Sequence, residues 1–213
     1  MNRKSSLICN IIIVIMVVFA CILMFFGINF MGSSLTLSSK KIEMFKYFTV
    51  DSNILMGLVS LIFSYYLISK KKIPKWLYSL KLLGTVGVTL TFLTVVFYLG
   101  PTSRFGFFSM FTNANLFLHF LIPVLSIITF IFYEKNKYLT FKDALIGTSS
   151  MLIYSIYYIT NAFSHIESGR IPIKYDWYYF ARGGVVSSLI VFCLMLLFTF
   201  IISLVLWQCN KKK

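Results

Sequence analysis

His119 is the residue in this chain whose type and position best suit proton transfer. It lies inside the apolar run Asn115–Tyr133, which is long enough to cross a bilayer. Inserting a full charge at such a depth costs roughly 2.5–3.5 kcal/mol, so an ionisable side chain there faces the bundle interior or a wet cavity. Two interpretations stay open. His119 is either a neutral histidine that hydrogen-bonds between helices or a general base or ligand in a membrane-embedded site.

Further polar side chains gather where the second and fourth apolar runs begin. Thr49 and Asn53 are one helical turn apart, as are Asn115 and His119, so each pair shares a helix face. Thr49 and His119 lie at similar depths from the same surface, and they meet in an outer-leaflet cavity if the two spans are neighbours.

This arrangement has a possible chemistry and a plain structural alternative. A threonine hydroxyl is a poor nucleophile until a base takes its proton, and His119 could serve as that base for Thr49. Asn53, Asn115 or a backbone amide at the start of the second span could stabilise the oxyanion. Alternatively, Thr49 caps or back-bonds its own helix, and the asparagines hold helices together.

The fifth apolar run carries a polar stripe at helical spacing, which a lipid-bathed helix must turn toward protein or water. We assign Tyr158 and Asn161 from this stripe to a wall of the same cavity, where they would contact substrate. Interhelical hydrogen bonds and interfacial tyrosines are the alternative. Residues 171–179 are rich in aromatic side chains and are expected to form an aromatic belt rather than a lid.

The composition defines the class of protein. The chain has 213 residues, of which 59% are hydrophobic and 12% charged, so it is predicted to be an all-α, polytopic membrane protein. No linker, repeat or low-complexity segment divides it, so residues 1–213 are expected to form a single domain. Windows of about 20 apolar residues predict six transmembrane helices in one bundle. The predicted spans are Leu7–Met31, Phe45–Ile68, Leu80–Leu99, Ala114–Tyr133, Ala144–Phe163 and Val185–Trp207.

The basic residues predict the orientation. The net charge is +14, but the lysines and arginines form short clusters between apolar runs and not the basic face of a nucleic-acid-binding domain. Of these residues, 13 fall in the N-terminus, the second and fourth loops and the C-terminal tail, with Lys81 counted as a flank of the second loop, and 7 fall in the first, third and fifth loops. By the positive-inside rule, both termini are cytoplasmic. The first run is too long for a cleaved signal peptide and is expected to be an anchor in a cell membrane. The richness in Lys, Ile, Phe and Asn fits a bacterial protein.

No motif predicts a metal or cofactor. The four cysteines form no Cys-x-x-Cys pair and no Cys/His cluster with metal-ligand spacing, so they are interpreted as small hydrophobic side chains.

Two short segments resemble a known family. Residues Lys46–Asn53 resemble the Tyr-Phe-Thr-x-x-Ser-Asn signature of the bacterial Pr6Pr membrane proteins. Residues Leu116–Pro123 resemble their Leu-x-x-His-x-x-x-Pro signature. That group is similar to the androgen-induced and androgen-dependent membrane proteins of animals, which are six-span threonine hydrolases of branched fatty-acid esters. The resemblance implies that Thr49 and His119 are a catalytic pair.

Two classes of function follow as hypotheses. The first is a fatty-acyl ester hydrolase with an intramembrane Thr/His pair near the outer leaflet. The second is a non-enzymatic membrane protein that binds a lipid or small molecule or acts as an assembly partner. A transporter is less favoured, because inverted repeats and broken helices are not evident in the sequence. Membrane lipids are the expected partners, with an acyl ester as substrate in the first case. The sequence leaves the oligomeric state open.

Overall fold

The protein is built almost entirely from helices. The computed structural model describes residues 2–32, 39–167 and 170–211. Within these ranges, extended pairing is limited to one isolated bridge between Glu167 and Arg170, so the predicted all-α class is confirmed. The elements are α1 (Arg3–Phe26), η1 (Lys41–Lys46), α2 (Phe48–Ile68), α3 (Lys75–Thr94), η2 (Val95–Leu99), α4 (Gly100–Thr102), η3 (Phe107–Phe111), α5 (Ala114–Leu116), η4 (Phe117–Leu121), α6 (Ile122–Ile128), η5 (Thr129–Tyr133), α7 (Phe141–Ile146), α8 (Ser149–Phe163) and α9 (Gly184–Lys211).

Several of these elements join into continuous membrane-length helices. Within the described residues, five segments are long and apolar enough to cross a membrane: Arg3–Phe26, Phe48–Ile68, Lys75–Thr102, Ala114–Tyr133 and Gly184–Lys211. They correspond to the first four predicted spans and the sixth. An exposed apolar helix of such length needs a hydrocarbon environment or a partner, and its backbone is satisfied internally.

The fifth predicted span, Ala144–Phe163, is divided in the structure. The chain turns at Gly147 between α7 and α8. The Ala144 carbonyl instead accepts a hydrogen bond from the Ser203 hydroxyl of α9 at 2.7 Å. With 15 residues, α8 is about 22 Å long, which is shorter than the roughly 30 Å of a hydrocarbon core. The structure therefore shows five candidate spans, and the predicted count of six is not confirmed.

Two π-helical turns interrupt the third and fourth spans just before a proline. The η2 turn precedes Pro101, and the η4 turn precedes Pro123. Proline has no N–H to donate, and its ring collides with the carbonyl four residues earlier, so a regular α-helix cannot run through it. A wider π turn accommodates that defect. For Pro123, the carbonyl four residues earlier belongs to His119, so this proline sets the local backbone of the predicted site.

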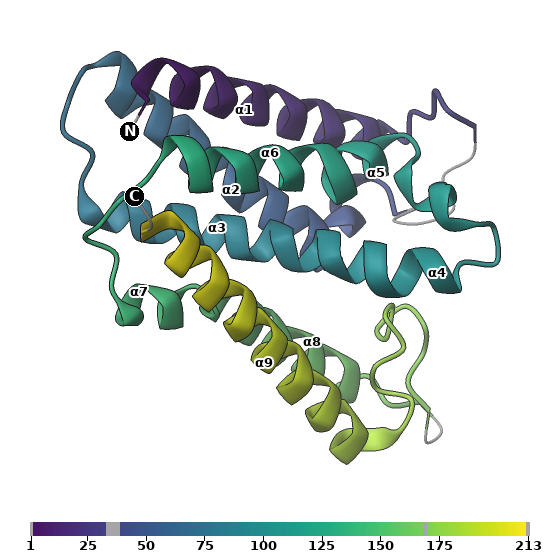
Figure 1. The fold of residues 1–213 in the computed structure, drawn as a ribbon. Coiled ribbons are helices and arrows are strands. Elements are labelled where there is room, and N and C mark those ends of the chain that lie inside the picture. The colour runs from purple at the N-terminus through teal and green to yellow at the C-terminus, as the bar shows by residue number, and fades with distance from the viewer. Residues whose placement is uncertain (1, 33–38, 168–169, 212–213) are drawn as a thin grey trace.

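The helices pack around α3. This helix lies between α2, α6 and α9, with α1 along α2 and α6 on one side and α8 beside α9 on the other (Figure 1). One cluster of buried apolar side chains includes Phe63 of α2, Leu82 of α3 and Tyr158 of α8. A second cluster includes Ile13 of α1 and Met56 of α2. Because α2 contributes to both clusters, packing holds it from two sides.

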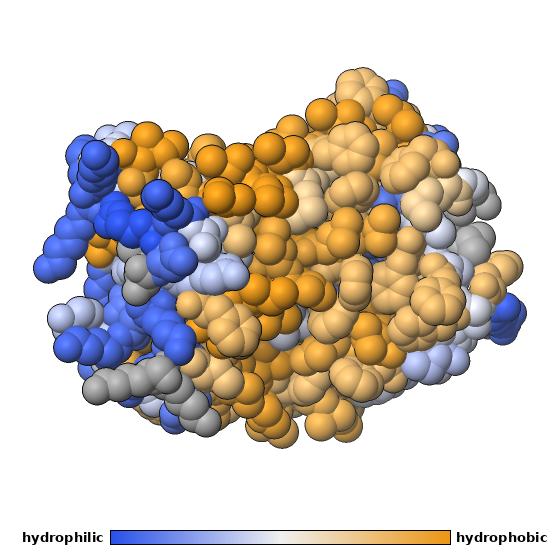
Figure 2. Space-filling view, turned by 45° about the horizontal axis from the view of Figure 1, so that its top comes forward, coloured by the Kyte–Doolittle hydropathy of each residue, from blue (hydrophilic) through white to orange (hydrophobic). Residues whose placement is uncertain are grey.

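The surface divides into an apolar band and a hydrophilic end. Figure 2 shows apolar residues over most of the visible face, a dense group of hydrophilic residues at the end where both termini lie in Figure 1, and fewer hydrophilic residues at the opposite end. Large apolar side chains are exposed along α1 and α9, among them Ile8, Ile15, Val186 and Leu194. So much exposed apolar surface is unusual for a water-soluble monomer and is compatible with a multi-pass integral membrane protein.

Candidate functional site

Thr49 lies at the N-terminal end of α2. It is the second residue of that helix and is buried. Its side chain lies next to the phenol of Tyr178. The same phenol oxygen accepts the N–H of Phe48 at 3.2 Å, one of the first-turn donors that a helix cannot satisfy by itself. Burial raises the pKa of the Tyr178 phenol above its usual value, so this group stays neutral near neutral pH. Tyr178 therefore caps α2 and contacts the Thr49 hydroxyl at the same time.

His119 lies in the π-helical turn η4 and is only 2% exposed. Its Nδ1 is 2.9 Å from the carbonyl oxygen of Met110. A carbonyl oxygen only accepts hydrogen bonds, so Nδ1 carries the proton in this contact. In the neutral ring, Nε2 is then the nitrogen with a free lone pair. An imidazole held in this tautomer presents the basic nitrogen that a general base requires.

Asn53 joins the two segments that carry Thr49 and His119. Its amide nitrogen donates to the Thr49 carbonyl at 2.7 Å and to the Leu118 carbonyl at 3.1 Å, and the residue is fully buried. The start of α2 and the η4 turn are therefore neighbours. Among the described residues, no hydrogen bond joins the Thr49 hydroxyl to the His119 imidazole. Both amide hydrogens of Asn53 are used by carbonyls, so in this structure its side chain positions the two segments and offers no donor to an oxyanion.

The loop after α8 covers the N-terminal end of α2. Tyr158 of α8 is fully buried, donates to the Asp176 carboxylate at 2.5 Å and accepts the N–H of Tyr178 at 3.1 Å. The rings of Trp177 and Tyr178 also pack on the ring of Tyr158. We expected residues 171–179 to form an interfacial aromatic belt, but two of their aromatic rings point inward. The loop links Tyr158 to Thr49 through Tyr178.

The two remaining predicted site residues occupy different places. Asn115 is buried in α5, four residues before His119, and its backbone N–H donates to the Thr112 carbonyl at 3.0 Å. Asn161 is partly exposed, and its side-chain amide lies 3.5 Å from the Tyr175 carbonyl. Asn115 thus belongs to the His119 segment, whereas Asn161 contacts the loop after α8.

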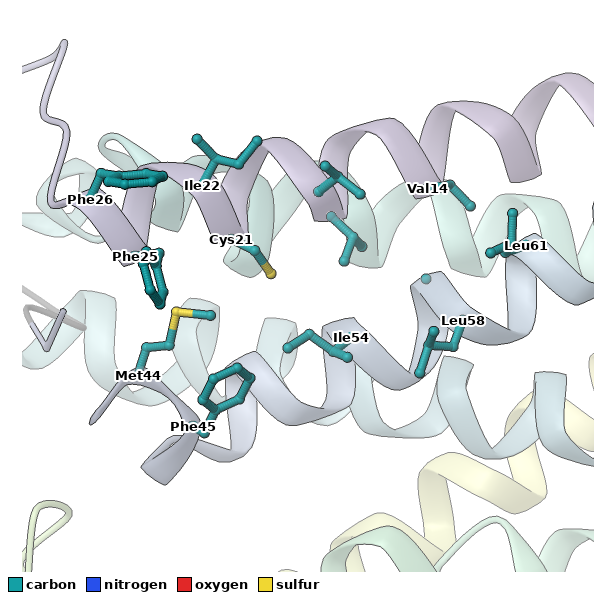
Figure 3. Close-up of a pocket in the computed structure, with 13 residues that line it drawn as sticks. Val14, Cys21, Ile22, Phe25, Phe26, Met44, Phe45, Ile54, Leu58 and Leu61 are labelled. Carbon is teal, nitrogen blue, oxygen red and sulfur yellow. The ribbon is translucent and has the colours of Figure 1, made fainter. Parts of the chain in front are cut away.

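An apolar groove of about 490 Å³ runs between α1 and α2. Figure 3 shows Cys21 and Phe25 of α1 facing Met44 and Ile54 across it. Ile54 directly follows Asn53, so the groove lies beside the turn of α2 that contains Asn53, although Thr49, Asn53 and His119 are not among its lining residues. Its lining is almost free of polar groups, which suits a hydrocarbon chain. The lining residues are Val14, Val17, Val18, Cys21, Ile22, Phe25, Phe26, Met44, Phe45, Ile54, Gly57, Leu58 and Leu61.

A second buried polar cluster lies nearer the hydrophilic end of the bundle. The Lys81 ammonium donates to Asn10 and, at 2.8 Å, to Ser60, and it lies 3.7 Å from the Glu134 carboxylate. The other oxygen of Glu134 accepts from Ser6 at 2.9 Å and from Asn10 at 2.5 Å. All five residues are fully buried. Lys81 is therefore not part of a basic loop flank, as we had counted it, but of an ion pair in the core.

The buried contacts of Lys81 and Asp176 were not predicted from the sequence, although each residue has an unusual sequence setting. Lys81 stands between Leu80 and Leu82 in a run whose other members are apolar or small, which is an unusual setting for a solvated lysine. Asp176 is the lone carboxylate in its aromatic loop segment, residues 171–182. Neither signal names the partner, because the contacts join residues far apart in the sequence.

No outside likeness assists the assignment of this site. Comparison of the chain with protein-family models, with curated proteins and with solved structures finds no match. In the described ranges, no group of three or more His, Cys, Asp or Glu side chains is placed to hold a metal ion. The fold and surface are compatible with a helical, multi-pass membrane protein.

Proposed function

We propose that this integral membrane protein hydrolyses a fatty-acyl ester, with Thr49 as nucleophile and His119 as general base. The hydroxyl oxygen of Thr49 would attack the ester carbonyl while its proton passes to Nε2 of His119. The imidazolium would then protonate the departing alcohol. Water, deprotonated by the same histidine, would release the fatty acid and restore Thr49.

The observation that carries this proposal is the contact of Asn53 with both catalytic segments. One buried amide donates to the carbonyl of Thr49 and to that of Leu118, the residue before His119. The Met110 carbonyl supports it further, because it holds the imidazole in the tautomer that leaves Nε2 basic. The proposed chemistry needs the two segments fixed next to each other, and these contacts supply that fixation.

The oxyanion donor follows from the position of Thr49 in its helix. The backbone N–H groups in the first turn of α2 have no acceptor inside that helix, and they point toward the helix N-terminus. The Thr49 N–H is the one closest to the proposed nucleophile, so we assign it the role of donating a hydrogen bond to the developing oxyanion. Asn53 then acts as a positioning residue, and Asn115 lies four residues before the proposed base in the same helical segment.

The substrate class follows from the apolar groove. A chain of methylene groups between α1 and α2 would lie along Ile54 and reach the turn that holds Thr49. Leu58 and Leu61 of the groove lining are exposed, so the ester could enter sideways from the membrane. In the structure the Thr49 side chain lies next to the Tyr178 phenol, and attack requires its hydroxyl to turn toward His119. Such tightening on substrate binding is common in active sites.

The membrane topology is part of the same proposal. We propose that residues Ala144–Phe163, which include the end of α7 and all of α8, form one interrupted crossing. This makes six crossings in all and both termini cytoplasmic. The two chain ends lie at the same end of the bundle, as an even number of crossings requires (Figure 1). The site would then face the non-cytoplasmic side of a bacterial cell membrane.

The test is hydrolysis of a fluorogenic long-chain ester by the purified protein in detergent. Thr49→Ala and His119→Gln should each lower turnover by roughly 100-fold or more, with unfolding temperatures that stay close to the wild type. Thr199→Ala is the matched control, because Thr199 is equally buried but donates to its own helix at Met195. Turnover unaffected by Thr49→Ala would exclude the mechanism.

The second candidate function is lipid binding without hydrolysis. It is favoured by the groove between α1 and α2 and by the contact of the Thr49 hydroxyl with Tyr178. In that case the protein would retain a fatty-acyl ester without cleaving it. This second function would be supported if the wild type, Thr49→Ala and His119→Gln all bound the ester stoichiometrically and released it intact.

A further inference from the structure

The hydrophilic end of the bundle holds a second hollow, unrelated to the Thr49 and His119 segments. It has a volume of about 460 Å³ and lies between the first turns of α1 and the end of α2. Its lining comprises Arg3, Lys4, Leu7, Leu67 and Lys70. Three cationic side chains and two leucines thus share one cavity, which is an amphipathic lining.

Arg3 fastens the two walls of this hollow. Its Nη2 lies 3.3 Å from the Tyr66 carbonyl, 3.4 Å from the Leu67 carbonyl and 3.3 Å from the Lys71 carbonyl, at the C-terminal end of α2. These contacts use one of the three guanidinium nitrogens. The planar group has five N–H donors in all, so the remaining ones can serve an anion without loosening the wall.

Lys70 enters the lining because of how α2 ends. Its φ of 53° is in the left-handed region, a conformation common just after a helix C-terminus. The turn brings Lys70 into the wall opposite Lys4 of α1, with Lys71 and Lys72 following in sequence. No carboxylate lines this hollow, so no side chain of its lining neutralises the positive charge of Arg3, Lys4 and Lys70.

We propose that this hollow binds the headgroup of an anionic phospholipid. A phosphodiester matches the cationic rim, since arginine and lysine are strong phosphate donors. Leu7 and Leu67 would contact the glycerol and upper acyl carbons. From there, the exposed apolar side of α1 with Ile8, Ile11 and Ile15 continues along the membrane-length helix, which gives the acyl chains a surface to follow. A soluble phosphate would use the cationic rim and leave the leucines without a role.

The test compares thermal unfolding of the purified protein in detergent with added phosphatidylglycerol, phosphatidylcholine of the same chains, or glycerol phosphate. We expect phosphatidylglycerol to raise the unfolding temperature and the other two to have little effect. In the double variant Lys4→Gln/Lys70→Gln, the phosphatidylglycerol concentration for half the shift should rise roughly 30-fold, since each lysine contributes a factor of about five.

The matched control is Lys135→Gln/Lys137→Gln. It removes the same charge from two exposed lysines that follow the fourth span and lie outside the hollow. The control should respond to phosphatidylglycerol like wild type. Three results would overturn the proposal: an equal response to both lipids, an equal loss in the control variant, or an equal shift with glycerol phosphate. The last would indicate a soluble anion site.

Discussion

Asn53 of α2 donates a hydrogen bond of 3.1 Å to the carbonyl of Leu118, 65 positions further along the chain. Leu118 belongs to the π-helical turn before Pro123, and its neighbour is His119. The second hydrogen of the same amide goes to Thr49 at 2.7 Å. A single buried side chain therefore holds the proposed nucleophile segment against the proposed base segment.

In the variant Asn53→Ala, ester turnover should fall further than the lower stability of the protein accounts for. The carbonyls of Thr49 and Leu118 would lose their shared donor, at a cost of about 1–3 kcal/mol, and the spacing between the two segments would relax. Ser64→Ala serves as control, because its hydroxyl donates at 2.8 Å to Ser60 within the same helix. Turnover and unfolding temperature are measured for both. Wild-type turnover in Asn53→Ala would contradict the positioning role.

Replacing Tyr178 by Phe should raise the reactivity of Thr49. The ring and its packing on Tyr158 remain, while the oxygen that accepts from Phe48 and contacts the Thr49 hydroxyl is lost. We expect faster turnover together with a loss of about 1 kcal/mol in stability. Stopped-time hydrolysis assays and thermal unfolding measure the two effects. Abolished turnover in a folded Tyr178→Phe protein would instead make this phenol part of the catalytic machinery.

The Lys81–Glu134 ion pair should behave as a coupled unit. Lys81→Met alone would strand a buried carboxylate and destabilise the protein by about 3–5 kcal/mol. The double variant Lys81→Met/Glu134→Leu should recover much of that loss, because two apolar groups replace two charges. Chemical unfolding in detergent is the measurement, with the exposed Lys142→Met as control. Additive losses in the double variant would show that the two side chains do not depend on each other.

Asp143 should make stability depend on pH in the acid range. Burial alone would raise the pKa of this carboxyl, but hydrogen bonds from Ser79 and Thr140 and the Lys75 ammonium at 3.1 Å outweigh it and lower the pKa to about 2. The folded state therefore binds fewer protons than the unfolded chain below about pH 4. The stabilisation is complete above that pH and is lost as pH falls toward 2.

The variant Asp143→Asn tests this dependence. It should cost about 1–2 kcal/mol at pH 7, a range already reduced for solvent screening. It should also make the unfolding temperature depend less on pH between pH 4 and pH 2. Lys142→Gln, a change at the neighbouring exposed position, should leave the profile unaltered. A profile that falls equally steeply in Asp143→Asn would assign the acid sensitivity to other carboxyl groups.

The sequence predicts the helical class and the positions of most spans because a run of about 20 apolar residues has few other solutions in a bilayer. It also locates Thr49, Asn53 and His119 as polar groups at comparable depth. The division at Gly147 was missed, because apolar runs before Gly147 and after Ser150 keep the 20-residue window apolar, and hydropathy does not register a turn. The turn is supported by Ser203 of α9, which lies 59 residues away from its acceptor.

The contacts of the site could not be predicted from the sequence either, because they depend on tertiary packing. Tyr178 was assigned to an interfacial belt by composition, and only the packing of its loop on α8 brings it to Thr49. Lys81 was counted as an exposed basic residue, and only the meeting of α1, α2, α3 and η5 buries it with Glu134. Residue type predicts what a side chain can do, whereas its partner depends on tertiary packing.

The most direct measurement is to identify the residue modified by a long-chain fluorophosphonate. The purified protein in detergent is treated with the probe, digested and mapped by mass spectrometry. The account predicts a phosphonate adduct on Thr49 in wild type and in Thr199→Ala, and no adduct in a folded His119→Gln variant. An adduct on Tyr178 or another residue, or no adduct in wild type that binds the fatty-acyl ester intact, would contradict the Thr49/His119 hydrolase.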